Sequence, residues 1–202
     1  MNTTNTAGVR TMDEAFQKLL DADTHPENIS DALKRNAPMP PGPTLVPVKR
    51  YTSRVYHELE KEHLWAKSWQ MACHEDDFQQ VGDVVPYDIT TMSFLVVRVA
   101  EDEYKAYYNA CLHRGRKLRE SRGTSLDELR CPFHGWSWNL DGSLKQIPCA
   151  YDYAGLNRDE ERLPEVRLAR WGRFIFINPD PEGESLESFL GDLGTHLSLI
   201  HI

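Results

Sequence analysis

The sequence predicts a mostly β domain of small antiparallel sheets, preceded by an N-terminal helical arm. Short runs of β-branched and aromatic residues alternate with turn residues from about residue 70 to residue 179. Among the turns, Asp141-Gly142 stands between WSWNL and SLKQI and is a strong hairpin signal. The residues before this region are patterned as helices and as a proline-rich connector.

The first fifty residues are predicted to be a flexible arm with one short helix. Apolar residues recur at helical spacing from Met12 to Leu20, and polar residues stand between them. Residues 37–47 contain five prolines, which favour an extended connector over a packed element.

A second helix is predicted after the connector, with Thr52 or Ser53 as its N-cap. We expect this helix to pack on the domain through one apolar stripe. The stripe consists of Val55, Leu59, Ala66 and Trp69. The predicted organisation is therefore an arm over residues 1–50, a domain with its leading helix over 51–180, and the start of a linker over 181–202.

The composition indicates a soluble protein that does not bind nucleic acid. The net charge is −8, which disfavours a polyanionic partner. The longest apolar runs, such as residues 94–97, are long enough for a strand and too short for a membrane span. The N-terminus has no apolar segment of a secretory signal, so the four cysteines are expected to be metal ligands or structural thiols in a cytoplasmic protein.

Two cysteine–histidine pairs carry the recognisable chemistry. Cys111 and His113 are separated by one residue, Cys131 and His134 by two, and 17 residues lie between the pairs. Two thiolates and two imidazoles are suited to a tetrahedral zinc ion or to an iron–sulfur cluster. The spacing alone does not decide between these two kinds of site.

The residues around the two pairs resemble a known family. The sequences CLHRG from Cys111 and CPFHGW from Cys131 resemble the two halves of the Rieske [2Fe–2S] signature. Positions 116 and 133 are Arg and Phe, where the cytochrome-complex type carries a cysteine in each loop. The residues HRG from His113 and HGW from His134 instead resemble the alpha subunits of Rieske non-haem iron aromatic ring-hydroxylating oxygenases.

This resemblance implies a cofactor and a function. It implies that Cys111 and Cys131 hold the inner iron and that His113 and His134 hold the outer iron. Histidine ligation raises the cluster potential to about −150 to +300 mV. The implied function is the electron relay of an oxygenase that hydroxylates an aromatic or similarly apolar small molecule with O2 and NADH-derived electrons. The implied partners are a ferredoxin or flavin reductase that donates electrons, and further copies of the full-length subunit.

In this family a C-terminal domain holds a mononuclear iron through two histidines and a carboxylate, and we expect that domain to be missing here. Only ten residues follow Asp192, and His196 and His201 stand there without a carboxylate motif. The chain is thus expected to be a fragment with no catalytic residue of its own. Two rivals stay open, a free-standing Rieske ferredoxin and a zinc-stabilised interaction module.

We expect a specific role for each of four further features of the sequence. Cys73 and His74 are adjacent in a strand and point to opposite faces, so we expect structural roles for both. Cys149 is expected to be at least half-buried. Five basic residues and one acidic residue between positions 114 and 122 form a basic collar that could attract an acidic partner. Trp136 and Trp138 are expected to lie on one face as a hydrophobic cover over the cluster.

Overall fold

A computed structural model describes residues 14–25, 27 and 46–193 of the 202 residues. Residues Arg54–Gly191 form one compact unit, and the flanking residues belong to a second unit. The second unit contains α1 (Glu14–Asp21), which agrees with the predicted arm helix, and α2 (Lys49–Thr52). Most of the predicted proline-rich connector, together with His196 and His201, lies outside the described residues.

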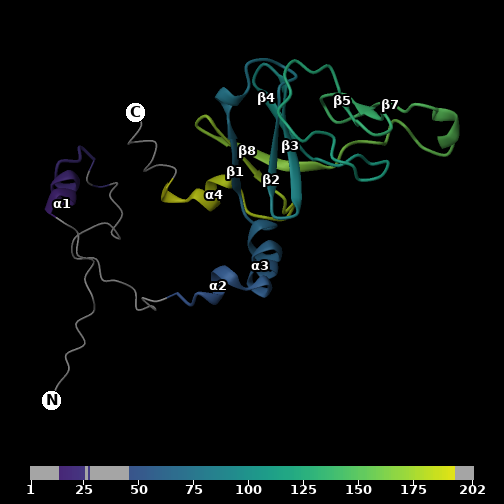
Figure 1. The fold of residues 1–202 in the computed structure, drawn as a ribbon. Coiled ribbons are helices and arrows are strands. Elements are labelled where there is room, and N and C mark those ends of the chain that lie inside the picture. Colours follow the sequence, from purple (N-terminus) through teal and green to yellow (C-terminus); the bar gives the residue numbers. More distant parts are fainter. Residues whose placement is uncertain (1–13, 26, 28–45, 194–202) are drawn as a thin grey trace. The chain divides into compact units, whose positions relative to one another are not determined.

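Six antiparallel strands make the larger sheet of the compact unit, in the order β1-β9-β8-β4-β3-β2. Figure 1 labels β1, β2, β3, β4 and β8 of this sheet. The strands are β1 (Gln70–His74), β2 (Val84–Ile89), β3 (Met92–Ala100), β4 (Glu103–Tyr108), β8 (Glu165–Trp171) and β9 (Phe174–Asn178). The hydroxyl of Tyr87 on β2 donates to Oε1 of Gln70 on β1 over 3.1 Å, which links the two outer strands. The mostly β prediction is confirmed, and the sheet is almost closed.

The larger sheet buries side chains on both of its faces. On β3, Leu95 and Val97 belong to one buried cluster, and Phe94 and Val96 belong to another. All four are fully buried. This explains the unbroken apolar run of residues 94–97, because a strand covered on both faces needs no polar positions.

The smaller sheet has three strands, in the order β5-β6-β7. They are β5 (Leu129–Arg130), β6 (Ser137–Trp138) and β7 (Leu144–Gln146), and Asp141-Gly142 forms the predicted turn between the last two. In Figure 1 this sheet and the short helix η5 (Ala150–Tyr153) extend beyond one end of the larger sheet. One of the two buried clusters fills the space between the sheets and includes Trp138 and Tyr107.

The second helix is present, but its packing differs from the prediction. In the structure it consists of α3 (Arg54–Glu60) and a π-helical turn, η3 (Lys61–Trp65). Trp69 is buried, but Val55 and Leu59 are 69% and 46% exposed. A π turn adds a residue per turn and rotates the following side chains, so residues before and after it do not share the stripe that a regular helix would give.

The segment after β9 belongs to the compact unit and packs on its larger sheet. Helix α4 (Leu186–Leu190) begins after Ser185, whose side chain accepts from the amide of Ser188, and Leu186 is buried. The indole of Trp69 donates to the carbonyl of Glu184 over 3.0 Å. Residues 181–191, which the sequence assigns to a linker, are therefore held against the sheet.

The remaining helical turn, η4 (Glu75–Asp77), follows β1 directly. Within residues 14–25, 27 and 46–193, no helix has the length and apolar character that crossing a bilayer requires.

Gly142 is required by the packing of the hairpin turn on Tyr107. Its φ is +84°, and an added Cβ would lie 2.6 Å from Cε1 of Tyr107. We expect Gly142→Ala to lower the free energy of unfolding by about 3 kcal/mol, from left-handed backbone strain plus overpacking. Gly172→Ala is the control, because Gly172 has φ +57° and open space around it, and it should cost only about 1 kcal/mol. Equal losses in urea denaturation would contradict the steric argument.

Candidate functional site

The two cysteine–histidine motifs fold into loops with the same backbone hydrogen bonds. We call residues 111–116 the first loop and residues 131–136 the second loop. In each, the cysteine amide donates to the carbonyl five residues later, and the glycine amide donates back to the cysteine carbonyl. These bonds are Cys111 to Arg116 (2.8 Å), Gly115 to Cys111 (2.7 Å), Cys131 to Trp136 (2.8 Å) and Gly135 to Cys131 (3.2 Å). Two separate parts of the sequence thus present their ligand candidates from equivalent turns.

Glycine is needed in both loops for the backbone conformation. Gly115 has φ +71° and Gly135 has φ +76°, values that L side chains rarely adopt. Each glycine lies four residues after its cysteine, where the chain turns back. The chain therefore makes a tight loop at both positions.

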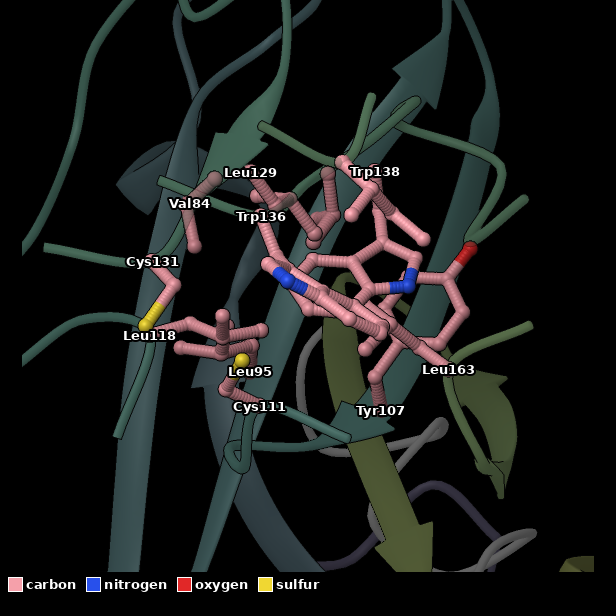
Figure 2. Packing of buried hydrophobic residues seen from close by; sticks show 12 residues of the cluster. Val84, Leu95, Tyr107, Cys111, Leu118, Leu129, Cys131, Trp136, Trp138 and Leu163 are labelled. Carbon is pink, nitrogen blue, oxygen red and sulfur yellow. The ribbon is translucent and has the colours of Figure 1, made fainter. Parts of the chain in front are cut away.

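The two loops bring two thiols together in the buried cluster between the sheets. Cys111 and Cys131 are 2% and 3% exposed. Figure 2 shows both sulfur atoms at one edge of this cluster. Burial raises the pKa of Cys111 to about 11; the amides of His113 and Arg114 donate toward its sulfur and oppose this rise. A thiol pair in this setting stays protonated until a cation takes the place of the protons.

The two imidazoles lie beside each other but in different surroundings. Their ring centroids are 4.7 Å apart. His134 is exposed and contacts the exposed ring of Phe133, whereas His113 is half-buried against Trp136. Burial, with His134 and Arg114 nearby, holds the pKa of His113 below its ordinary value. A neutral imidazole is the form that binds a metal.

The donor set fits a binuclear cluster better than a single ion. Nδ1 of His113 is buried and has no hydrogen-bond partner in the described part of the chain, as expected of an atom reserved for a metal. The four side chains gather as a thiol pair and an imidazole pair. Among the residues that the structure describes, no three His, Cys, Asp or Glu side chains converge to hold one ion. A mononuclear zinc site would need four donors around one point.

Two buried polar residues that the sequence does not single out fix irregular parts of the chain: Asn109 fixes the residues that follow the first loop, and Asp83 links the turn before β2 to Ser125. Oδ1 of Asn109 accepts from the amides of Leu118 and Arg119 over 2.9 and 3.1 Å, and its Nδ2 donates to the carbonyl of Arg119. Asp83 accepts from the amides of Gln79, Gln80 and Ser125. Burial would raise the pKa of Asp83, but these three amides hold it below its usual range.

The family model for the Rieske [2Fe–2S] domain matches residues 68–158, which include both loops, β1 to β7 and η5. Residues 68–158 are a Rieske [2Fe–2S] domain. The predicted resemblance is thereby confirmed, and the domain is homologous to the N-terminal part of Rieske oxygenase alpha subunits.

Several oxygenases are similar to the chain around this Rieske domain. The carnitine monooxygenase oxygenase subunit of Escherichia coli (strain K12) is 35% identical over 149 residues, which cover 74% of this chain and 40% of that protein. The anthranilate 1,2-dioxygenase large subunit of Acinetobacter baylyi is 32% identical over 152 residues, which cover 74% of this chain and 32% of that protein. The chain thus spans less than half the length of these relatives.

Solved structures give the same result for the fold. Naphthalene 1,2-dioxygenase from Rhodococcus sp., bound to indole, superposes with a TM-score of 0.70 at 33% identity and covers 77% of this chain and 36% of its own. The apo form of a quaternary ammonium Rieske monooxygenase has a TM-score of 0.70 at 27% identity, over 76% of this chain and 45% of its own.

The other two cysteines lie away from the thiol pair of the Rieske domain. Cys73 is buried in the second cluster, and burial raises its pKa to about 12, which fits the predicted structural role. His74 accepts from the amide of Asp76 and caps η4. The prediction that Cys149 is at least half-buried is wrong, because Cys149 is exposed at a turn with φ +55°.

The basic collar is weaker than the sequence count indicates. Three of its five basic side chains form ion pairs with carboxylates. These pairs are Arg116–Glu120, Lys117–Asp88 and Arg122–Asp77, each with an N···O distance of 2.7 or 2.8 Å. Asp77 and Asp88 are distant in sequence, so a count over neighbouring residues misses them.

The cover over the histidine is mainly Trp136. Its indole stacks on the ring of His113 with a centroid distance of 5.1 Å and an interplanar angle of 2°. The rings of Trp136 and Trp138 are 6.3 Å apart, and Trp138 is fully buried in the middle of the cluster (Figure 2). Trp138 therefore supports the cover from the side of the core.

We expect Asn109→Ala to release the first loop. The change leaves two amide donors without their acceptor, which should lower the free energy of unfolding by about 2 to 4 kcal/mol and reduce iron bound per folded chain. Asn178→Ala is the control, because Asn178 is equally buried but stands on β9 and accepts from the amide of Asp180. The control should lose stability and keep its iron. Equal iron content in both variants would contradict an anchoring role for Asn109.

Proposed function

We propose that this chain carries the [2Fe–2S] electron relay of a Rieske oxygenase. In this proposal Cys111 and Cys131 hold the inner iron, and His113 and His134 hold the outer one. The observation that carries it is the buried thiol pair beside a pair of imidazoles, presented by two equivalent loops of a Rieske domain.

The surroundings of the proposed ligands suit their roles in holding the cluster and passing electrons. The cluster, when bound, accepts and returns one electron at a potential raised by its histidine ligands. The amides of His113 and Arg114 direct partial positive charge at the Cys111 sulfur, and so stabilise negative charge there. Trp136 excludes water from one face of His113. The exposed His134 leaves one edge open to a partner.

The activity we infer for the full-length protein is oxygenation of a small molecule with O2. Its relatives are a monooxygenase and dioxygenases, and their lengths leave room for a domain with a mononuclear iron. The names of the relatives include carnitine, anthranilate and biphenyl. The aromatic substrate therefore stays a prediction, with a quaternary ammonium compound as the other candidate.

We infer that an electron donor, a ferredoxin or flavin reductase, docks at the exposed rim of the two loops. Leu112 and Phe133 are 39% and 61% exposed there, and Phe133 lines a shallow hollow with Arg116 and Pro132. Assembly with further copies of the full-length subunit is also inferred. A similar quaternary ammonium Rieske monooxygenase has been described in terms of inter-subunit electron transfer.

The cofactor assignment is tested by metal analysis of the purified chain. We expect iron and acid-labile sulfide in equal amounts, a brown colour, and a rhombic EPR signal after reduction with dithionite. Cys111→Ser should lose the signal, because it removes one of the two buried thiols. Cys73→Ser is the control, since it changes a buried cysteine outside the site and should keep the cluster. Colourless protein with bound zinc would overturn the assignment.

The cover is tested by comparing two equally buried tryptophans. Trp136 and Trp69 are 5% and 6% exposed, so replacement of either by alanine should cost a similar stability of about 3–5 kcal/mol. Only Trp136→Ala should also raise the cluster's midpoint potential, because water then stabilises the more negative reduced state. Trp136→Phe should give a smaller rise in midpoint potential, and it provides a second variant if Trp136→Ala does not fold. Identical potentials in all variants, measured by redox titration of the folded protein, would count against a cover.

A further inference from the structure

Tyr153 makes a hydrogen bond to one of the proposed ligands. Its hydroxyl lies 3.1 Å from Nε2 of His113. The residue stands in η5, 40 positions along the chain, and is half-buried. The motif that carries the family resemblance does not include it.

Together with Trp136, Tyr153 encloses the imidazole of His113. Trp136 stacks flat on this ring, and the ring of Tyr153 stands at 89° to it with a centroid distance of 5.9 Å. The two enclosing rings also contact each other, at 5.1 Å and 87°. These contacts fix the plane of the imidazole, and the hydrogen bond selects one of the two ring rotations, 180° apart about the Cβ–Cγ bond, that share this plane.

The rotation decides which ring nitrogen faces the cluster position. Nε2 is occupied by Tyr153, and the other nitrogen, Nδ1, is buried without a partner in the described part of the chain. A neutral imidazole that offers the lone pair of Nδ1 to a metal carries its proton on Nε2. The Nε2–H group then donates to the hydroxyl oxygen of Tyr153.

We propose that Tyr153 is a positioning residue that aims Nδ1 of His113 at the outer iron and lowers the potential of the cluster. This inference rests on the proposed function. A hydrogen bond from the second ring nitrogen to an acceptor fixes the tautomer and makes a ligating histidine a stronger electron donor. Stronger donation stabilises the oxidised iron more than the reduced iron.

The fold brings Tyr153 to this place through the turn at Cys149. Cys149 has a left-handed backbone, which is uncommon for a residue other than glycine. Its carbonyl accepts from the amide of Asp152 over 3.0 Å, and the carbonyl of Tyr153 accepts from the amide of Leu156 over the same distance. Ile147 is buried just before the turn. The turn therefore directs η5 back toward the first loop.

The two histidines differ in this respect. Among the described residues, no hydrogen bond reaches the ring of His134, which is exposed beside Phe133. Tyr153 accordingly acts on one ligand of the outer iron and leaves the other free.

The test compares Tyr153→Phe with Tyr151→Phe in the 202-residue chain. Tyr153→Phe keeps the ring packing and removes only the hydroxyl. Tyr151 is in the same helix but is 79% exposed and serves as the matched control. At a fixed pH we expect a rise in midpoint potential for Tyr153→Phe and none for the control. The nitrogen hyperfine couplings of one histidine ligand should change, and those of the other should not.

A second measurement does not need the cluster. In the metal-free chain, long-range ¹H–¹⁵N correlation spectra report the tautomer of His113, which should be the Nε2–H form in the wild type and a mixture in Tyr153→Phe. Absence of an iron–sulfur signal in the wild type would refute the proposed function. The tautomer of His113 in the metal-free chain would still show whether Tyr153 orients this ring. If Tyr153→Phe leaves the tautomer of the metal-free chain unchanged, or matches Tyr151→Phe in the potential of the loaded chain, the inference is overturned.

Discussion

The structure depends on burying two thiols side by side where two separate loops meet. Cys111 and Cys131 are almost inaccessible, and burial raises the pKa of Cys111 to about 11, so the pair opposes negative charge in the absence of a cation. An iron–sulfur cluster removes this conflict because iron takes the place of the thiol protons. Each loop then needs a glycine with positive φ to turn back within a few residues and hold its sulfur inside.

The rest of the domain keeps these loops in place. One face of the larger sheet packs in the second buried cluster. The other face, which includes Leu95 and Val97 on β3, packs in the same cluster as Cys111 and Cys131 of the two loops. Where the chain leaves the strands, the side chains of Asn109 and Asp83 take the place of regular pairing, since together they make seven hydrogen bonds to backbone and side-chain groups. The site is accordingly held by buried hydrogen bonds and packing on its inner side and is exposed at His134.

The sequence predicts the features that are encoded locally. The cysteine–histidine spacing, the Asp141-Gly142 turn and the short apolar strands can each be recognised within a few residues, and the family resemblance rests on the residues around the two cysteine–histidine pairs. The features that depend on residues distant in the sequence cannot be predicted in this way. Tyr153 reaches His113 from 40 residues away, and the carboxylates that pair with Lys117 and Arg122 come from β2 and η4. The π turn that follows α3 and interrupts the regular stripe is likewise not revealed by the apolar pattern.

We propose that one iron is held by the two cysteines and the other by the two histidines. Mössbauer spectroscopy of the ⁵⁷Fe-enriched chain, reduced by one electron, tests it most directly. We predict two unequal sites, a ferric one with sulfur ligands only and a ferrous one with the isomer shift of mixed nitrogen and sulfur ligation. Two sites with sulfur ligands only, or a single mononuclear iron site, would contradict the account.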